Sequence, residues 1–181
     1  MSATEYVILV DAQDREIGTA EKLYAHQQNL LHRAFSVFIF RHQPQLELLL
    51  QQRALGKYHS PGLWTNTCCS HPCSTEDLLY AGQKRLVEEL GLTANLSHVG
   101  WFHYNVHFLN GLSENEIDHV LVGTVSPHAT ISPNPEEVHT YRWVTLQDLR
   151  AEMAAHPEQF TPWLEKALEV ATRPSSIGSG Y

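Results

Sequence analysis

The chain has 181 residues and a formal net charge of −8, with 12 lysine and arginine residues against 20 aspartate and glutamate residues. This length suits one domain with a sizeable core, and the shortage of basic side chains argues against a nucleic-acid or anionic-membrane surface. The longest apolar run, AFSVFIF, is too short for a membrane helix, and the first residues do not read as a signal peptide. We therefore expect a cytoplasmic, monomeric protein with one domain at residues 1–172 and a frayed tail at 173–181.

Strands are predicted where β-branched and aromatic residues gather between polar turns. In chain order they lie at residues 6–10, 34–40, 46–51, 99–108, 119–125 and 140–144. Helices are predicted at residues 76–90, 146–155 and 162–171. The first helix follows CSTED, where Ser74 or Thr75 can cap it, and it ends at Gly91. Several antiparallel strands with helices packed outside them predict an α+β sandwich.

The segment EKLYAHQQNLLHRAFS contains two of the 12 histidines, His26 and His32, six residues apart. Two metal ligands on one face of a straight helix would be four residues apart, so a shared ion requires a bend between these histidines. Taken alone, the pair is more typical of one surface histidine and one packed histidine. The high histidine count nevertheless favours a metal site somewhere in the chain.

The three cysteines all lie between Cys68 and Cys73, in and just after the segment WTNTCCSHP. Adjacent cysteines seldom pair, and no distant cysteine is available for a disulfide. A zinc knuckle would need a second cysteine pair, so a single reactive thiol fits better. In an extended segment Cys69 and His71 share one side, whereas Cys68 points the other way and is expected to be packed and inert.

Two further segments contain acidic residues that could bind a metal ion. KRLVEELGL ends the predicted helix and places Glu89 where it could hold a divalent cation, although Glu88 and Glu89 are also typical of a solvated helix face. In SENEIDHVLVG, Glu114 and Glu116 alternate, so they point the same way in a strand. Such acids are often solubilising charge. If they converge with the histidines, they form a metal site with nitrogen and oxygen ligands.

Together these segments closely resemble the type I isopentenyl diphosphate isomerases, a family of the Nudix structural superfamily. The resemblance runs from EKLYAH through HRAFS, RALGKYHSPGLWTNTCCSHP and ENEID to FTPWL, and TNTCCSHP is its most specific part. It implies a Nudix-like α/β/α sandwich with mixed, largely antiparallel sheets and flanking helices. It also implies an isomerase of isoprenoid biosynthesis that converts isopentenyl diphosphate into dimethylallyl diphosphate by metal-assisted protonation and deprotonation. The implied partner is a small prenyl diphosphate, with no nucleic acid and no membrane.

The resemblance also implies roles for particular residues. Cys69 and Glu116 would be the acid/base pair, with Tyr104 assisting Glu116. The ligands of one divalent ion, manganese, magnesium or zinc, would be His26, His32, His71, Glu114 and Glu116. A magnesium ion on the substrate diphosphate would be held with the help of Glu89, and the diphosphate charge would be neutralised by Lys22, Arg53, Lys57 and Arg85. Tyr104 and Trp163 would line the hydrocarbon pocket, with Trp163 facing the carbocation; by residue type alone Trp64 would also suit that role.

The chain departs from the Nudix hydrolase signature at residues 70–92. The signature would have glycine at Ser70 and an Arg-Glu pair at Lys84 and Arg85, whereas its glutamates are kept at Glu76, Glu88 and Glu89. Arginine in place of a metal-binding glutamate weakens a hydrolytic metal cluster and favours holding a diphosphate. Two alternatives remain open: a pyrophosphohydrolase on the same fold, and a non-catalytic metal-binding module that unfolds when its metal is removed.

Overall fold

The computed structural model describes residues 3–174, so most of the tail expected at 173–181 lies outside the described residues. Its strands are β1 (Tyr6–Val10), β2 (Glu16–Glu21), β3 (His32–His42), β4 (Leu46–Arg53), β5 (Trp64–Thr65), β6 (Cys68–Ser70), β7 (Ser97–His107), β8 (Ser113–Thr124) and β9 (Val138–Thr145). Its helices are α1 (Lys22–Gln27), α2 (Leu78–Leu90), α3 (Leu146–Ala155), the short 3-10 helix η1 (Pro157–Gln159) and α4 (Leu164–Ala171). None of these helices is long and apolar enough to cross a membrane.

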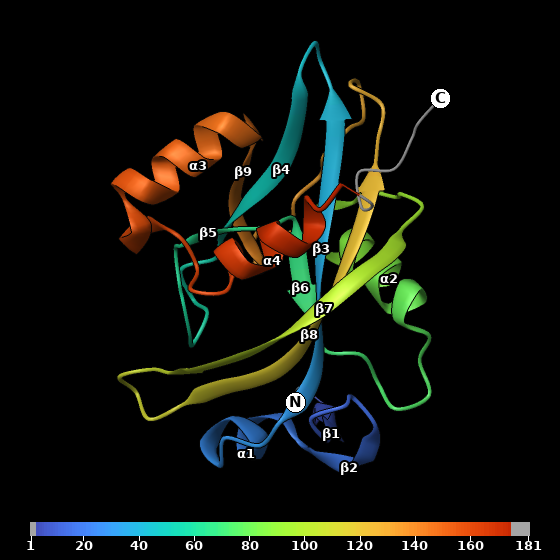
Figure 1. Cartoon of the computed structure of the whole chain (residues 1–181), viewed down its shortest axis with the longest axis vertical. Helices are drawn as coiled ribbons and strands as arrows, with labels where there is room; N and C mark the ends of the chain where they lie inside the picture. The colour runs from blue at the N-terminus through green and yellow to red at the C-terminus, as the bar shows by residue number, and fades with distance from the viewer. Residues whose placement is uncertain (1–2, 175–181) are drawn as a thin grey trace.

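Strand β3 runs through the middle of a single mixed sheet (Figure 1). It pairs in parallel with β8 on one side and antiparallel with β1, β6 and β4 on the other. The remaining pairings, β1–β2, β4–β5, β4–β9 and β7–β8, are antiparallel. The prediction of a mixed, largely antiparallel sheet is therefore confirmed. The parallel pairing sets His32 beside Glu116, which begins the assembly of the site.

Side chains of β3 alternate between two apolar clusters because successive residues of a strand face opposite sides. Phe38 and Phe40 pack with residues of α3 and α4 on one face of the sheet. Val37 and Ile39 pack on the other face, against Leu86 and its neighbours in α2. Figure 1 shows α3 and α4 in front of the sheet and α2 behind it, so the predicted α/β/α sandwich with flanking helices is confirmed.

Helix α2 begins two residues later than expected, and its cap differs from the prediction. The side chain of Asp77 accepts a hydrogen bond from the backbone nitrogen of Tyr80 at 3.0 Å, so the predicted cap at Ser74 or Thr75 is wrong. The hydroxyl of Ser74 is instead directed away from the helix and donates to Glu16. The predicted end at Gly91 is confirmed, with φ of 60° in the left-handed region that glycine adopts easily.

The turn between β1 and β2 is fastened to the sheet by Asp14. Its carboxylate accepts hydrogen bonds from Nε of Arg33 at 2.9 Å and from Nε2 of His119 at 2.7 Å. The other ring nitrogen of His119 is 2.9 Å from Nε2 of His98. This clasp, defined as Asp14, Arg33, His98 and His119, matters for the site because the chain leaves β2 directly into α1, which bears His26.

Candidate active site

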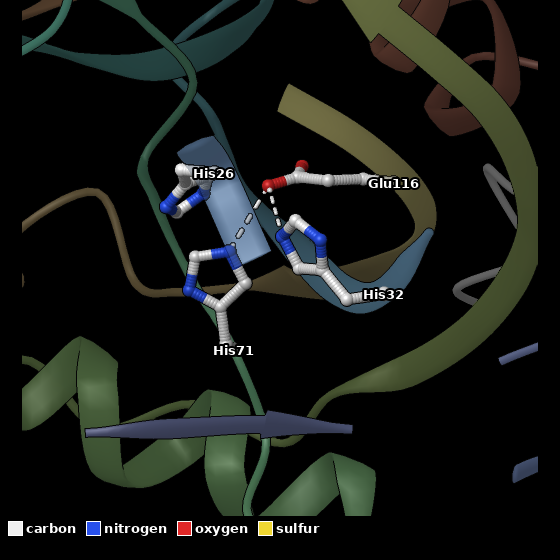
Figure 2. Close-up of side chains that lie close together, drawn as sticks. All are labelled: His26, His32, His71 and Glu116. Carbon is white, nitrogen blue, oxygen red and sulfur yellow. Dashed lines mark hydrogen bonds and ion pairs between the residues drawn. The ribbon is translucent and has the colours of Figure 1, made fainter. Parts of the chain in front are cut away.

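Four side chains converge near one end of β3: His26 from α1, His32 from β3, His71 just after β6 and Glu116 from β8 (Figure 2). One nitrogen or oxygen atom of each lies within 4.8 Å of those of the others. Oε1 of Glu116 is 3.0 Å from Nε2 of His71 and 3.3 Å from Nε2 of His32. The bend that the sequence required between His26 and His32 is present at the end of α1, where Asn29 has φ of 53°.

Burial and unmet hydrogen bonding at this cluster fit a bound cation. His26 is 1% exposed, and neither of its ring nitrogens has a hydrogen-bond partner within residues 3–174. Burial lowers the pKa of His26 to about 3 and that of His71 to about 4. Burial opposes ionisation of Glu116, but its contacts with His32 and His71 hold its pKa well below the usual range. Buried imidazoles around one carboxylate form a donor set for a divalent cation.

Glu114 lies outside this four-residue group, although it is on the same strand as Glu116 and is also buried. Its Oε1 lies 2.9 Å from Nε2 of His59, an ion-pair contact. Burial, reinforced by the nearby Glu116, raises the pKa of Glu114. Its role as a metal ligand therefore stays a prediction, and the structure adds His59 as its partner.

The two adjacent cysteines face opposite sides of β6. Cys68 is fully buried in the cluster beneath α2, whereas Cys69 is half-buried and lines a cavity together with His71. The packing predicted for Cys68 and the side shared by Cys69 and His71 are thus confirmed. Nη1 of Arg53 lies 4.0 Å from Sγ of Cys69, but burial outweighs this charge and raises the pKa of the thiol to about 12. Such a thiol suits a proton carrier better than a thiolate nucleophile.

All four basic residues expected at the diphosphate line the same cavity, and acidic side chains hold three of them. Nζ of Lys22 is 2.7 Å from Glu5, and Lys57 forms an ion pair with Glu137. Arg85 forms an ion pair with Glu137 at 2.9 Å. The cavity therefore has a group of basic side chains, three of which form ion pairs with carboxylates.

Glu89 also lines this cavity, but it is 4% exposed and both of its oxygens are engaged. Oε1 accepts from Nη2 of Arg85 at 3.0 Å, and Oε2 accepts from Nε2 of Gln51 at 3.1 Å. Burial raises the pKa of Glu89, with Arg85 opposing. Glu89 is therefore positioned beside the basic residues, as expected, but it is not a solvated helix-face residue.

Trp163 lines the cavity together with the aromatic residues Phe35 and Tyr58. Its Nε1 donates to Oδ1 of Asn66 at 3.1 Å, and its ring lies 6.2 Å from that of Tyr104 at 77°. Tyr104 stands directly opposite Glu116 in the β7–β8 pairing, yet its hydroxyl has no hydrogen-bond partner in the described part of the chain. Tyr104 is not among the residues that line this cavity, so its place in the hydrocarbon pocket stays a prediction. Trp64 packs against the apolar cluster beneath α4 and does not belong to the lining either. The geometry favours Trp163 over Trp64.

Three polar residues at the site, Asp118, His59 and Gln51, were missed from the sequence; Asp118 and Gln51 are buried and His59 is half-buried. Asp118 lines the cavity and accepts a hydrogen bond from Oγ of Ser36 at 2.8 Å; it continues the alternation of Glu114 and Glu116, so a signal for it was present. His59 and Gln51 gave no such signal, because neither stands in a spacing typical of a ligand.

Comparisons with known proteins first define the class. A family model described as NUDIX domain matches residues 30–164. The fold resembles that of DR0079 from Deinococcus radiodurans, with a TM-score of 0.75 over 93% of this chain and 100% of that chain, at 20% identity. It also resembles RenU, a Nudix hydrolase from M. smegmatis, with a TM-score of 0.61 over 98% of each chain, at 16% identity. The fold is a Nudix fold.

Two relatives of higher identity narrow the class. The chain is 48% identical over 172 residues to an isopentenyl-diphosphate Delta-isomerase of Photobacterium profundum, covering 93% of this chain and 95% of the relative. It is 49% identical over 159 residues to the protein of that name from Serratia proteamaculans, covering 88% of this chain and 87% of the relative. The chain belongs to the isopentenyl-diphosphate Delta-isomerase family of Nudix proteins.

Proposed function

We propose that the chain converts isopentenyl diphosphate into dimethylallyl diphosphate by a 1,3 proton shift, a step of isoprenoid biosynthesis. The observation that carries the proposal is the placement of Cys69 and Glu116. They belong to β6 and β8, which lie on opposite sides of β3, and both line one cavity. An unactivated alkene is a very weak base, so the reaction needs a proton donor and a proton acceptor fixed on either side of a flat hydrocarbon. Cys69 and Glu116 are those two groups.

Trp163 is the residue that stabilises the cation. Protonation of the alkene produces a tertiary carbocation, and an aromatic face within about 6 Å of a desolvated cation contributes up to about 2 kcal/mol. The hydrogen bond from Trp163 to Asn66 holds the ring in place. Because the site is mostly buried, water that would capture the cation as an alcohol is excluded.

Lys22, Arg53, Lys57 and Arg85 bind the diphosphate. Each can donate charge-assisted hydrogen bonds to its oxygens, and the binding energy, remote from the reacting carbons, orients those carbons. The diphosphate takes the place of Glu5 and Glu137 beside the basic groups. Glu89 helps to hold a magnesium ion that accompanies the diphosphate.

A divalent cation, manganese, magnesium or zinc, is held by His26, His32 and His71 with Glu116 and Glu114 as oxygen ligands. When bound, it tunes the acidity of Glu116 and fixes the direction of that carboxylate. Tyr104, opposite Glu116 and with a hydroxyl unengaged by residues 3–174, is placed to donate a hydrogen bond to it.

Pyrophosphate hydrolysis is the competing reaction on this fold, and the contacts of its signature residues disfavour it. Arg85, at a position where the hydrolase signature has a glutamate, forms ion pairs with Glu88 at 3.3 Å and with Glu89 at 3.0 Å. Glu76 accepts a hydrogen bond from the backbone nitrogen of Cys73. A hydrolytic centre gathers metal ions on several carboxylates, and the positive charge of Arg85 among these glutamates opposes such a cluster.

The test is to incubate the purified protein with isopentenyl diphosphate, magnesium and manganese in deuterated water and to follow the products by NMR. We expect dimethylallyl diphosphate with deuterium in its methyl group and no free phosphate. Release of phosphate without a shifted double bond would refute the proposal and would instead support pyrophosphate hydrolysis.

A further inference from the structure

His59, in the loop between β4 and β5, is a fourth histidine beside the three-histidine cluster, and its ring is held on several sides. It stacks on Phe108 with centroids 5.5 Å apart and 11° between the ring planes. The ring of Tyr58 meets it edge-on at 4.6 Å. Its side chain is only 10% exposed. Because this packing leaves the imidazole ring little rotational freedom, its N–H group points in a fixed direction.

The polar contact that His59 makes is with Glu114, where Nε2 of His59 lies 2.9 Å from Oε1 of Glu114. A carboxylate can only accept, so the ring is the donor. Glu114 is 4% exposed, and its backbone is fixed in β8 opposite Val106. Only the side-chain conformation of Glu114 is then free to change, and the contact with His59 restricts it. Without this donor, the buried carboxylate would lose its polar contact with His59 and would stay buried at a cost in free energy.

His59 also lies against the proposed metal site, because its ring centroid is 6.0 Å from that of His26. Glu114 is two positions before Glu116 on the same strand, so both carboxylates are presented from one side of β8. Groups that hydrogen-bond a ligating carboxylate orient it, and their loss typically weakens metal binding 10- to 100-fold. We propose that His59 is a positioning residue that holds the Glu114 carboxylate at the three-histidine site and thereby sets the affinity of that site for a divalent cation. This inference rests on the proposed metal site, and not on the reaction.

The experiment titrates metal-free protein with Mn2+ by calorimetry at constant pH. His59→Phe keeps a ring to stack on Phe108 but removes the donor, whereas His59→Gln keeps an N–H donor. We expect His59→Phe to bind Mn2+ about 10- to 100-fold more weakly than the wild type, and His59→Gln to recover most of the loss. His156→Phe is the matched control, because His156 is exposed and forms an ion pair with Glu158. The Mn2+ affinity of this variant should equal that of the wild type.

The single variant Glu114→Gln tests whether His59 acts on Mn2+ affinity through the Glu114 carboxylate. It also keeps the proposal falsifiable if His59→Phe alone is unstable. Adding His59→Phe there should change Mn2+ affinity no further. Unaltered affinity in His59→Phe, or equal losses in His59→Phe and His59→Gln, would overturn the proposal. Isomerase activity is measured separately, so an inactive wild type with the expected Mn2+ affinities would refute the proposed function and leave the role of His59 standing.

Discussion

Cys68 and Cys69 are chemically identical neighbours, and only the side of β6 on which each lies separates their roles. Cys68 is fully buried in the apolar cluster beneath α2, and this burial raises the pKa of its thiol. Cys69 faces the cavity, across from Glu116. A shift of β6 by one residue in its pairing with β3 would therefore place Cys68 at the cavity and bury Cys69 beneath α2.

Replacement of the Cys69 thiol should stop catalysis without disturbing the fold. We expect Cys69→Ala to lower kcat about 100- to 10,000-fold, the usual contribution of a positioned acid or base, with an unchanged circular dichroism spectrum. Cys73→Ala is the control, since Cys73 is exposed, and it should turn over at the wild-type rate. Steady-state kinetics of both variants measure this. Near-normal turnover by Cys69→Ala would remove the thiol from the mechanism.

At this scale, alternation along a strand was enough to predict which side chains share a side. The spacing of two residues pairs Cys69 with His71, and Glu114 with Glu116, and all four side chains line the one cavity. Alternation could not reveal His59, because a loop residue has no periodicity and its partner Glu114 is far away in sequence. Contacts between a loop and a strand depend on tertiary packing, which local spacing does not contain.

At the scale of elements, the cap of α2 can be tested separately from the site. Asp77→Ala removes the acceptor for the backbone nitrogen of Tyr80 and should lower the free energy of unfolding by about 0.5 to 2 kcal/mol. Thr75→Ala, at the position first predicted as a cap, should leave it unchanged. Urea denaturation of the two variants decides between these caps. Equal stability of both would mean that Asp77 contributes nothing as a cap.

The clasp on the β1–β2 turn should make stability depend on pH. Burial lowers the pKa of His119 below its ordinary 6.5, with Asp14 opposing and with His98 and Arg33 acting in the same direction as burial. Below pH 6.5 the unfolded chain therefore takes up a proton at this residue more readily than the folded chain. The resulting stability is complete above pH 6.5 and is lost as the pH falls through the lower, folded pKa.

His119→Gln removes that titration, so its free energy of unfolding should fall less than that of the wild type between about pH 7.5 and about pH 5.5. Urea midpoints of both proteins at the two pH values measure the difference. If the two proteins lose stability in parallel, His119 does not titrate as the clasp requires.

The six predicted strands and three predicted helices are all present, with their ends shifted by a few residues. The elements that the sequence did not predict include β2, α1, β5 and β6. β5 and β6 have two and three residues, too few to show a period, and β2 is mostly exposed with glycine inside it. These short elements are defined by pairing with a neighbouring strand or by packing, and not by local composition.

At the scale of the whole molecule, two apolar clusters fill both faces of the sheet, and this predicts a fold that does not need its metal. Treatment with a chelator should leave the far-ultraviolet circular dichroism spectrum and cooperative unfolding in place, while isomerase activity is lost and returns with added Mn2+. A non-catalytic metal-binding module would unfold instead. Loss of the native spectrum on chelation would support that alternative.

The parallel pairing of β3 with β8 has a consequence for how the protein is made. Ser36 and Asp118, which are hydrogen-bonded across this pairing, are 82 residues apart in the chain, and the histidines of the cluster all precede Glu116. During synthesis the ribosome therefore releases three imidazoles well before β8, the strand that pairs along β3 and supplies the carboxylate. Until β8 arrives, β3 exposes an unpaired central edge. Assembly of the three histidines with Glu116 and covering of this edge of β3 are therefore one event, and a nascent or truncated chain that ends before β8 can neither complete the cluster nor hide that edge.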